Sequence, residues 1–368
     1  MKNVFIAAIV ASLSTGVASA NEVHYSSQGG INALNATISG NGNSIGNSAP
    51  ASTHQITSRG TTTMRVSPTY GWGFSQYRYI TRTNYETSLT RSFPTDYSAA
   101  KQVGNNNSAT TVQSGRNNSL NFSQGSDTAF TETRRRYATG STITRDYRYW
   151  GYRDYTYRAS SAYDREFNSR YGYSNTYQRG AVTTASNNTL RATQYGDSNA
   201  ATINQLGNNN YASLYQSGYG NSADLMQGGD NASLNVSQYG TSNAATVRQY
   251  SMNTASLYQS GSGNQAEIFQ GNASGASQRI ASVANVSSTG TDNFVSVTQA
   301  GYYGGNSINI NQNGTGNSAI TTQTGRSSNA TLTQKGNNNN FSLNQTAHAG
   351  AISVAMLGDG GNININHR

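Results

Sequence analysis

The sequence predicts an all-β protein, a β-solenoid in which two short strands and two tight turns make one turn of about 22 residues. Three observations carry this prediction. Glutamines recur every eleven residues from Gln194 to Gln249, the phrase Asn-x-Ala-x-aliphatic-x-Gln precedes most of them, and glycine follows most of them two residues later. Because self-similarity at a fixed period is the mark of repeat architectures, the period is interpreted before any local motif.

The phrase has the spacing of a strand. From Asn210 to Gln216 it reads Asn-Tyr-Ala-Ser-Leu-Tyr-Gln, so Asn, Ala, Leu and Gln stand two residues apart. Residues two apart share one face of a strand, whereas the 3.6-residue period of a helix would scatter them. One turn cannot bury this face alone, so we expect each strand to pair with the strand one turn above, about 4.7–4.9 Å away.

The repeated amides are predicted to form ladders along the axis of the stack. Identical Asn and Gln side chains at one height in successive turns can donate to and accept from one another. Without such partners each buried amide would cost about 1–3 kcal/mol. The residues predicted to form ladders and to support self-assembly are Asn199, Gln205, Asn210, Gln216, Asn221, Gln227, Gln238, Asn243, Gln249, Gln270, Gln299, Asn306, Gln312, Gln323, Gln334 and Gln345.

This pattern resembles the curlin repeat, Ser/Asn-x5-Gln-x4-Asn-x5-Gln, of the curli amyloid subunits of bacterial biofilms. The stretch from Asn210 through Gln216 and Asn221 to Gln227 fits that spacing residue for residue. The resemblance implies a secreted subunit that polymerises into extracellular cross-β fibres of the biofilm matrix. It also implies partners: further copies of the chain, related curlin subunits, periplasmic chaperones and an outer-membrane secretion pore of the curli type. The length of the chain and its inserted segments depart from the family pattern.

Composition supports a thin-cored, exported protein. Of 368 residues 34% are hydrophobic and 11% charged, and there is no cysteine, so neither a thick core nor a disulfide framework is expected. Lys2, the apolar run from Val4 to Leu13 and the site Ala18-Ser19-Ala20 are typical of a signal peptide, with the mature chain beginning at Asn21. The run is shorter than the about 17–25 residues of a membrane span, so we expect no transmembrane segment and export of the chain. The resemblance to curlins implies that the route leads through the periplasm to the cell surface.

Shifts in composition divide the chain into six segments. They are a signal peptide (1–20), a Gly/Asn-rich segment with a first strand (21–49), a basic aromatic arm 1 (50–95), a short repeat block (96–127), a basic aromatic arm 2 (128–187) and the main repeat block (188–368). Residues 59–179 hold 17 basic and 8 acidic residues, a net charge of +9, and the remainder holds 7 of each. All the net charge therefore lies in or between the two arms.

The arms are predicted to form hairpins or a small sheet, because Arg and Tyr alternate along them. A disordered basic loop is the alternative. Arginine beside aromatic rings suits acidic polysaccharide or extracellular DNA, through charge pairing and stacking. The candidate adhesive residues are Trp72, Tyr77, Arg78, Tyr79, Arg134, Arg135, Arg136, Arg148, Trp150, Tyr152, Arg153 and Tyr155.

No catalytic, cofactor-binding or metal-ligating residue is proposed. The four histidines stand far apart without ligand spacing, and there is no cysteine to serve as ligand or nucleophile. The sequence therefore favours a structural protein over an enzyme. Two interpretations stay open: a curli-like fibre subunit, of which a minor or nucleating subunit is a variant, and a monomeric surface adhesin that uses the solenoid as a rigid spacer.

Overall fold

The computed structural model describes residues 9–11, 21–23, 25–29, 31–46, 53–66, 78–92, 100–125, 130–146, 155–158, 173–179, 184–250, 252–271, 280–300, 304–346 and 350–367. These residues form strands and connecting turns, and none of them is helical. The chain divides into two compact units. Unit 1 comprises Met1–Pro50, Asp96–Thr128 and Gly180–Arg368, and unit 2 comprises Ala51–Thr95 and Ala129–Arg179.

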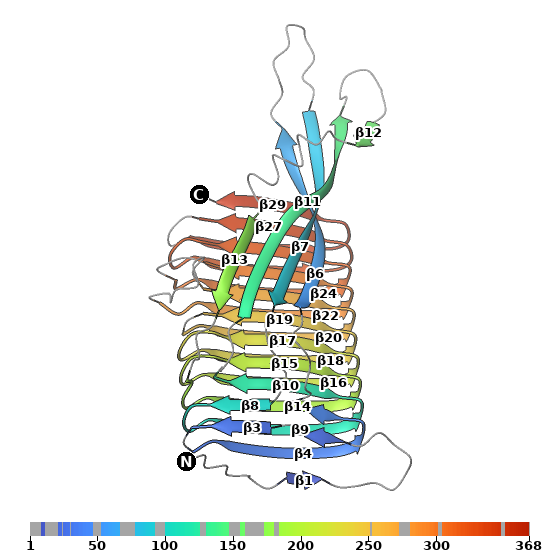
Figure 1. The fold of residues 1–368 in the computed structure, drawn as a ribbon. Coiled ribbons are helices and arrows are strands. Elements are labelled where there is room, and N and C mark those ends of the chain that lie inside the picture. Colours follow the sequence, from blue (N-terminus) through green and yellow to red (C-terminus); the bar gives the residue numbers. More distant parts are fainter. Residues whose placement is uncertain are drawn as a thin grey trace, which may run out of the picture. The chain divides into compact units, whose positions relative to one another are not determined.

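Unit 1 is a β-solenoid built from two parallel sheets, which Figure 1 shows as stacked arrows. Sheet A has the order β1 (Ile9–Ala11), β4 (Ala33–Asn41), β9 (Ser108–Arg116), β14 (Thr189–Asp197), β16 (Tyr211–Tyr219), β18 (Ser233–Thr241), β20 (Thr254–Ser262), β22 (Val283–Thr291), β24 (Ser307–Thr315), β26 (Asn329–Lys335) and β28 (Ala351–Leu357). Each strand of the sheet pairs with its neighbour one turn further along the chain.

Sheet B holds the alternate strands of the same turns. Its order is β2 (Glu22–Val23), β5 (Ser44–Ile45), β10 (Ser119–Gln124), β15 (Ala200–Gln205), β17 (Ser222–Gln227), β19 (Ala244–Gln249), β21 (Gln265–Gln270), β23 (Phe294–Gln299), β25 (Ser318–Gln323), β27 (Asn340–Gln345) and β29 (Asn362–His367). Two further strands, β3 (Tyr25–Gln28) and β8 (Ala100–Val103), belong to this sheet. The predicted solenoid of two strands and two turns per level is confirmed.

The two-residue period of the sequence sets which side chains form the core. In β16, Ala212, Leu214 and Gln216 are buried, whereas Tyr211 and Tyr215 point to the other face. The same alternation recurs through the stack, so that the core consists of aliphatic rows with buried amides on either side. Burial of these rows supplies the hydrophobic stabilisation that a single level lacks.

The short repeat block and the main repeat block form one continuous stack. β9 pairs with β14, and β10 pairs with β15, although arm 2 separates them in sequence. One level is assembled from two pieces, because β5 lies opposite Ser119 and Leu120 of β10 and β8 lies opposite Ser123 and Gln124. Arm 1 is therefore inserted within a sheet B strand rather than between two complete levels.

The two corners of each level differ. We call the connection from sheet A to sheet B the tight corner and the connection from sheet B to sheet A the variable corner. At the tight corner Asn264 follows Gln259 by five positions. At the variable corner the corresponding separation is 4 from Gln249 to Asn253, 12 from Gln270 to Ser282 and 64 from Gln124 to Asn188. Among the complete levels described, the length of the connection thus varies at the variable corner, whereas arm 1 interrupts a sheet B strand.

Unit 2 is an antiparallel sheet to which both arms contribute. Its order is β12 (Tyr155–Arg158), β11 (Phe130–Asp146), β7 (Arg78–Ser92) and β6 (Thr53–Val66), and β13 (Tyr173–Arg179) also pairs with β11. β6 and β7 come from arm 1, and the other three strands come from arm 2. The small-sheet prediction for the arms is met over these strands, but the sequence did not indicate that β7 and β11 would join the two arms into one sheet.

Candidate functional site: amide ladders and open strand edges

The glutamines of sheet B form an unbroken ladder from Gln102 to Gln345. The side-chain Nε2 of each level donates to Oε1 of the next level, at donor–acceptor distances of 2.6 to 3.1 Å. Gln205, for example, donates to Gln227 at 3.0 Å, and Gln227 donates to Gln249 at 3.1 Å. All these side chains are buried, so each bond satisfies a donor and an acceptor that water cannot reach.

The glutamines of sheet A form a second ladder with the same direction of donation. Gln194 donates to Gln216 and Gln216 donates to Gln238, both at 2.8 Å. The ladder is interrupted where Ser288 stands in the register of Gln259 and Gln312. The serine side chain is too short to reach the Oε1 of Gln312, and that buried oxygen has no hydrogen-bond partner.

The tight corner is closed by an asparagine ladder in which every amide group is engaged. The Nδ2 of Asn221 lies within hydrogen-bond distance of Asn199 Oδ1 at 3.1 Å, of Ser217 O at 3.2 Å and of Gly240 O at 3.0 Å. Its Oδ1 accepts from the backbone N–H and the Nδ2 of Asn243, both at 3.1 Å. Each asparagine therefore holds its own corner and both neighbouring levels.

Glycine makes the close stacking of the tight corner possible. Gly218 has a φ of 120°, and a Cβ built on it would lie 2.0 Å from the carbonyl oxygen of Gly240 one level along. Any larger residue would have to separate the levels there, because real Cβ atoms do not approach an oxygen so closely.

The variable corner is held by fewer bonds. The backbone N–H of Asn210 donates to Asn188 Oδ1 at 2.8 Å, but the Nδ2 of Asn210 is buried without a partner, as are those of Asn253 and Asn306. Ala232 and Ser282 stand at the same ladder position. At the levels of Gln124, Gln249 and Gln270 this corner is closed by the sheet B glutamine, whose Nε2 donates to the backbone carbonyl of the residue before the next sheet A strand.

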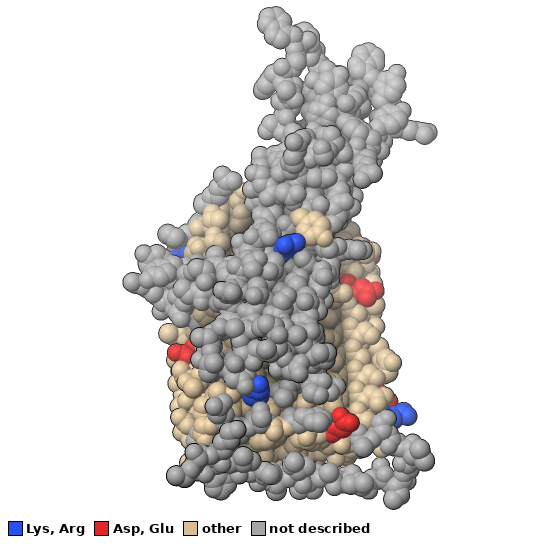
Figure 2. Space-filling view, in the orientation of Figure 1, with Lys and Arg blue, Asp and Glu red and all other residues tan. Residues whose placement is uncertain are grey.

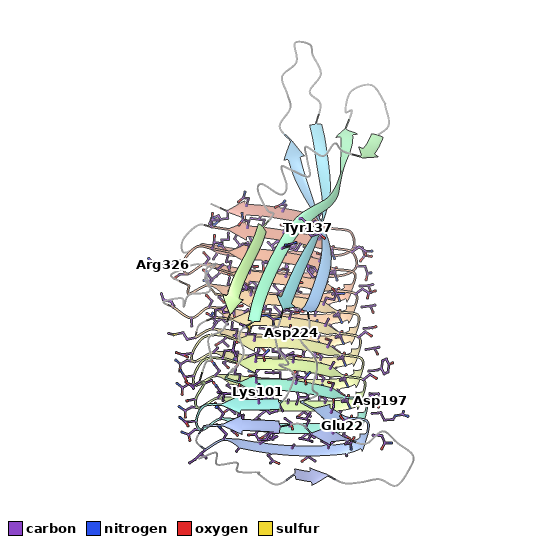
Figure 3. The ribbon with its side chains drawn as sticks, viewed as in Figure 1. Glu22, Lys101, Tyr137, Asp197, Asp224 and Arg326 are labelled. Carbon is purple, nitrogen blue, oxygen red and sulfur yellow. The ribbon has the colours of Figure 1, made fainter. Side chains whose placement is uncertain are left out.

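Charged groups are sparse on the described surface of unit 1, as Figure 2 shows. Among the described residues Arg116 pairs with Asp197 at 3.3 Å and Arg248 pairs with Asp224; Asp197 and Asp224 are labelled in Figure 3. Within the same residues no group of three or more His, Cys, Asp or Glu side chains could hold a metal ion, and no helix is long and apolar enough to cross a membrane. The conspicuous chemistry of unit 1 is therefore that of amides.

The repeats match a known family model. Residues 185–218, 207–240 and 305–336 each match the family described as the curlin associated repeat. The chain therefore carries curlin associated repeats. A search of the curated proteins finds no match to it. The matched segments contain parts of the amide ladders of both sheets and examples of both kinds of corner.

All sixteen ladder residues predicted from the sequence lie inside the stack of unit 1, and each is at most 1% exposed. Their role in self-assembly stays a prediction. Sequence reasoning missed Asn21 and Asn43, although Asn43 Oδ1 accepts from Asn118 and Asn21 Oδ1 accepts from Asn43. Asn43 has the expected apolar residue two positions on, Ile45, but arm 1 separates it from Gln102, which completes its level.

The structure brings together some of the predicted arm residues. Tyr79 and Tyr155 both lie opposite Arg145 in register, on β7 and β12 at the two sides of β11. Arg145 was not among the predicted adhesive residues. Arg78 also lies on β7, and Arg134, Arg135 and Arg136 follow one another on β11, where Arg135 is exposed. The remaining predicted residues lie outside the described residues: Trp72, Tyr77, Arg148, Trp150, Tyr152 and Arg153.

The stack ends in sheet strands at both extremes. At one end lies β4, whose inward residues are Leu34, Ala36 and Ile38, and at the other lies β28, with Ile352, Val354 and Met356 at the equivalent positions. At both ends the sheet A glutamine position is apolar, occupied by Ile38 and Met356. The edge of β4 is paired with β1, which lies within the predicted signal peptide.

Proposed function

We propose that this protein with curlin repeats is a secreted fibre subunit whose copies stack head to tail. In such a fibre, β28 of one copy pairs with β4 of the next copy, and β29 pairs with the first sheet B strands of that next copy. The observation that carries the proposal is that both ends of the stack are parallel strands in the register of the repeat. An unpaired strand edge is a template for another chain. The pairing of β1 with β4 supports it, because β4 accepts a parallel strand at the position where β28 of a second copy would lie.

The apolar residues at the two ends fit this joint. Ile352, Val354 and Met356 of one copy would stand over Leu34, Ala36 and Ile38 of the next. Ile352 and Val354, like Ile363 and Ile365 of β29, are only partly buried at the end of the stack. A further level would complete their burial, which contributes about 25 cal/mol per Å² of apolar surface. Removal of the predicted signal peptide would open the edge of β4.

Gly358 offers a sharp test of head-to-tail stacking. It occupies the close-approach position of the last tight corner, yet a Cβ on it would meet nothing within 4 Å in one copy. At every earlier described level, a Cβ added to the equivalent glycine would collide with the backbone carbonyl of the next level. In a fibre, the carbonyl of Gly40 in a second copy would take this place beside Gly358. We therefore expect Gly358→Ala to leave the monomer folded and to block fibre growth.

The matched control is Gly360→Ala. Gly360 also has a positive φ, 69° against 102° for Gly358, and a Cβ on it would likewise meet nothing within 4 Å. Its counterpart in the next copy is Gly42, which has no side chain to collide with. Mature wild-type chain and the G360A variant should form thioflavin-positive fibres with a reflection at about 4.7–4.8 Å, and G358A should not. Equal fibre growth of G358A and wild type would refute head-to-tail stacking.

The alternative function is a monomeric adhesin that uses the stack as a spacer. Its distinguishing outcome is mature wild-type chain that stays monomeric at micromolar concentration and shows no such reflection. On the fibre proposal, the partners are other copies and related curlin subunits, reached by export through the periplasm with chaperones and a curli-type outer-membrane pore. The protein would then contribute to adhesion within a biofilm matrix, as a major, minor or nucleating subunit.

The arms are proposed to bind acidic polysaccharide or extracellular DNA. Supporting observations are the charge of +9 between residues 59 and 179 and the row of Tyr79, Arg145 and Tyr155 across three strands of unit 2. Replacing Arg134, Arg135, Arg136, Arg148 and Arg153 by Ser should weaken retention on heparin and DNA columns and leave polymerisation intact. Unchanged retention would exclude these arginines as the binding groups.

A further inference from the structure

Four tyrosines form a column along the outer face of sheet A. Tyr195 and Tyr239 occupy one register position on β14 and β18, and Tyr215 and Tyr258 occupy the position two residues earlier on β16 and β20. The rings alternate between these positions over four consecutive levels. Successive ring centroids lie 5.9, 5.2 and 5.6 Å apart, so each ring contacts the next.

The column is accessible to solvent and is no part of the core. Tyr195, Tyr239 and Tyr258 are 40%, 38% and 43% exposed, and the core lies on the opposite face of their strands. Successive ring planes are tilted by 58°, 37° and 43°. Rings tilted in this way do not offer the flat common surface on which a sugar chain stacks. What they offer is a row of phenols held in contact and open to a small oxidant.

We propose that this column is a site of oxidative modification, at which Tyr215 and Tyr239 are coupled to dityrosine by hydrogen peroxide and a one-electron oxidation catalyst of the haem peroxidase class. These two rings have the shortest centroid distance and the smallest tilt of the three pairs. The fold holds them together before the reaction, and such proximity replaces an encounter between separate radicals. The product would join β16 to β18 covalently, a stabilisation independent of the fibre joint.

The chemistry balances with peroxide as the only oxidant. Each of two phenols gives up one electron and its hydroxyl proton, and one hydrogen peroxide takes both electrons and both protons to become two waters. The two phenoxyl radicals then form a carbon–carbon bond between the ring carbons that adjoin the hydroxyl-bearing carbons. The hydrogens displaced from those carbons move to the oxygens, which restores both phenols.

Tyr219 provides a control within the same strand as Tyr215. It is 59% exposed, more than any member of the column, and no ring contact joins it to another aromatic among the residues described. If exposure alone decided reactivity, Tyr219 would couple in preference to the column. If contact decides it, the Tyr215–Tyr239 bond will dominate and Tyr219 will remain unmodified.

The experiment treats mature chain with hydrogen peroxide and a haem peroxidase, and follows dityrosine fluorescence. After denaturation, cleavage before Asp197, Asp224 and Asp230 places Tyr195, Tyr215 and Tyr239 on three different fragments. We expect mass spectrometry to find the fragments of Tyr215 and Tyr239 joined. Tyr215→Phe or Tyr239→Phe should reduce that joined species by about tenfold or more, whereas Tyr219→Phe should not change it.

Phenylalanine keeps each ring and removes only the hydroxyl, and unchanged circular dichroism would show that the variants fold. Chain unfolded in guanidinium before oxidation should lose the preference for the Tyr215–Tyr239 bond. Three outcomes would overturn the proposal: no dityrosine, dityrosine confined to Tyr219 or to the tyrosines of the arms, or the same pattern of bonds in folded and unfolded chain.

Discussion

The tight and variable corners occur at every complete level, yet they differ in what they tolerate. At the tight corner Asn221 engages three acceptors with its Nδ2 and two donors with its Oδ1, and Gly218 leaves no room for a Cβ. At the variable corners that follow Gln124, Gln249 and Gln270, the closing bond runs from the glutamine side chain to the residue before the next strand. Because that bond does not pass through the loop, the corner accepts loops of very different length.

The variable corner is the place where this repeat protein can acquire new segments. Gln249, Gln270 and Gln124 make the same bond across separations of 4, 12 and 64 residues, at 3.0, 3.1 and 3.1 Å. Arm 2 thus occupies a position at which the level closes whether or not an insertion is present. The cost of lengthening such a loop grows only with the logarithm of its length.

Inserting a Gly/Ser segment of about eight residues should give the largest difference in stability between the two corners. Placed between Tyr219 and Gly220 at the tight corner, it should disrupt the stack, because it displaces Asn221 from two neighbouring levels. Placed between Gly325 and Arg326 at a variable corner where Gln323 Nε2 donates to Ser328 O at 3.2 Å, the same segment should cost about 1 kcal/mol. Circular dichroism and thermal unfolding of the two variants check this. Equal loss of structure in both would contradict the distinction between the corners.

Substitution of glycine within the tight corner should have the next largest effect. Gly218→Ala puts a Cβ 2.0 Å from a backbone oxygen, whereas Gly220→Ala meets its nearest atom, the Ser242 hydroxyl oxygen, at 3.7 Å. Gly220 has a φ of 66°, which alanine adopts at a cost of about 1–2 kcal/mol, whereas the φ of 120° at Gly218 lies outside that left-handed region and strains alanine further. We expect G218A to lower the unfolding free energy by several kcal/mol, and chemical denaturation measures the difference. Similar losses in the two variants would mean that the levels separate easily.

Asparagine substitutions at the two corners should differ in their cost to stability. Asn221→Ala leaves donors and acceptors unpaired on both adjacent levels, and we expect it to cost about 2–4 kcal/mol. Asn210→Ala at the variable corner removes an Nδ2 that has no partner and one acceptor for Ala232 N–H, so it should cost about 1 kcal/mol. Denaturant unfolding of the two variants, side by side, is the measurement. A larger loss for N210A would reverse our assignment of the stronger corner.

Repair of the interrupted ladder should give the smallest effect and the opposite sign. Ser288→Gln would offer an acceptor to Gln259 and a donor to the unpartnered Oε1 of Gln312. We expect a gain of about 1 kcal/mol in unfolding free energy. The control is Ser287→Gln, which faces the other side of β22. If S288Q were no more stable than S287Q, continuity of the ladder would have little energetic value.

Much of unit 1 could be predicted from the sequence, because the repeat states both its period and its inward face. Ala212, Leu214 and Gln216 are two residues apart, and only a strand places them together. The same two-residue alternation runs through β22 and β28. Local pattern suffices where each level contacts only its neighbours.

Features that depend on distant pairing could not be predicted. Nothing local to Arg134 indicates that it lies opposite Leu89 of the other arm, because antiparallel register is set by both strands. The two corners share a five-residue spacing in most levels, so their difference lies in hydrogen bonds that the sequence does not state. The tyrosine column was missed for a related reason: its members alternate between two register positions and follow no single period.

The level divided between β5 and β8 has a consequence for the order of folding. Its two pieces must meet across the whole of arm 1, and closing so long a loop costs about 2 kcal/mol more than closing a five-residue corner. From Thr189 onwards most levels need contacts only about 22 residues apart, which favours rapid formation. We therefore expect nucleation in the C-terminal half. The edge formed by β28 and β29 would then be able to pair with a second molecule before the opposite end has folded. A growing fibre would therefore add molecules at this edge first.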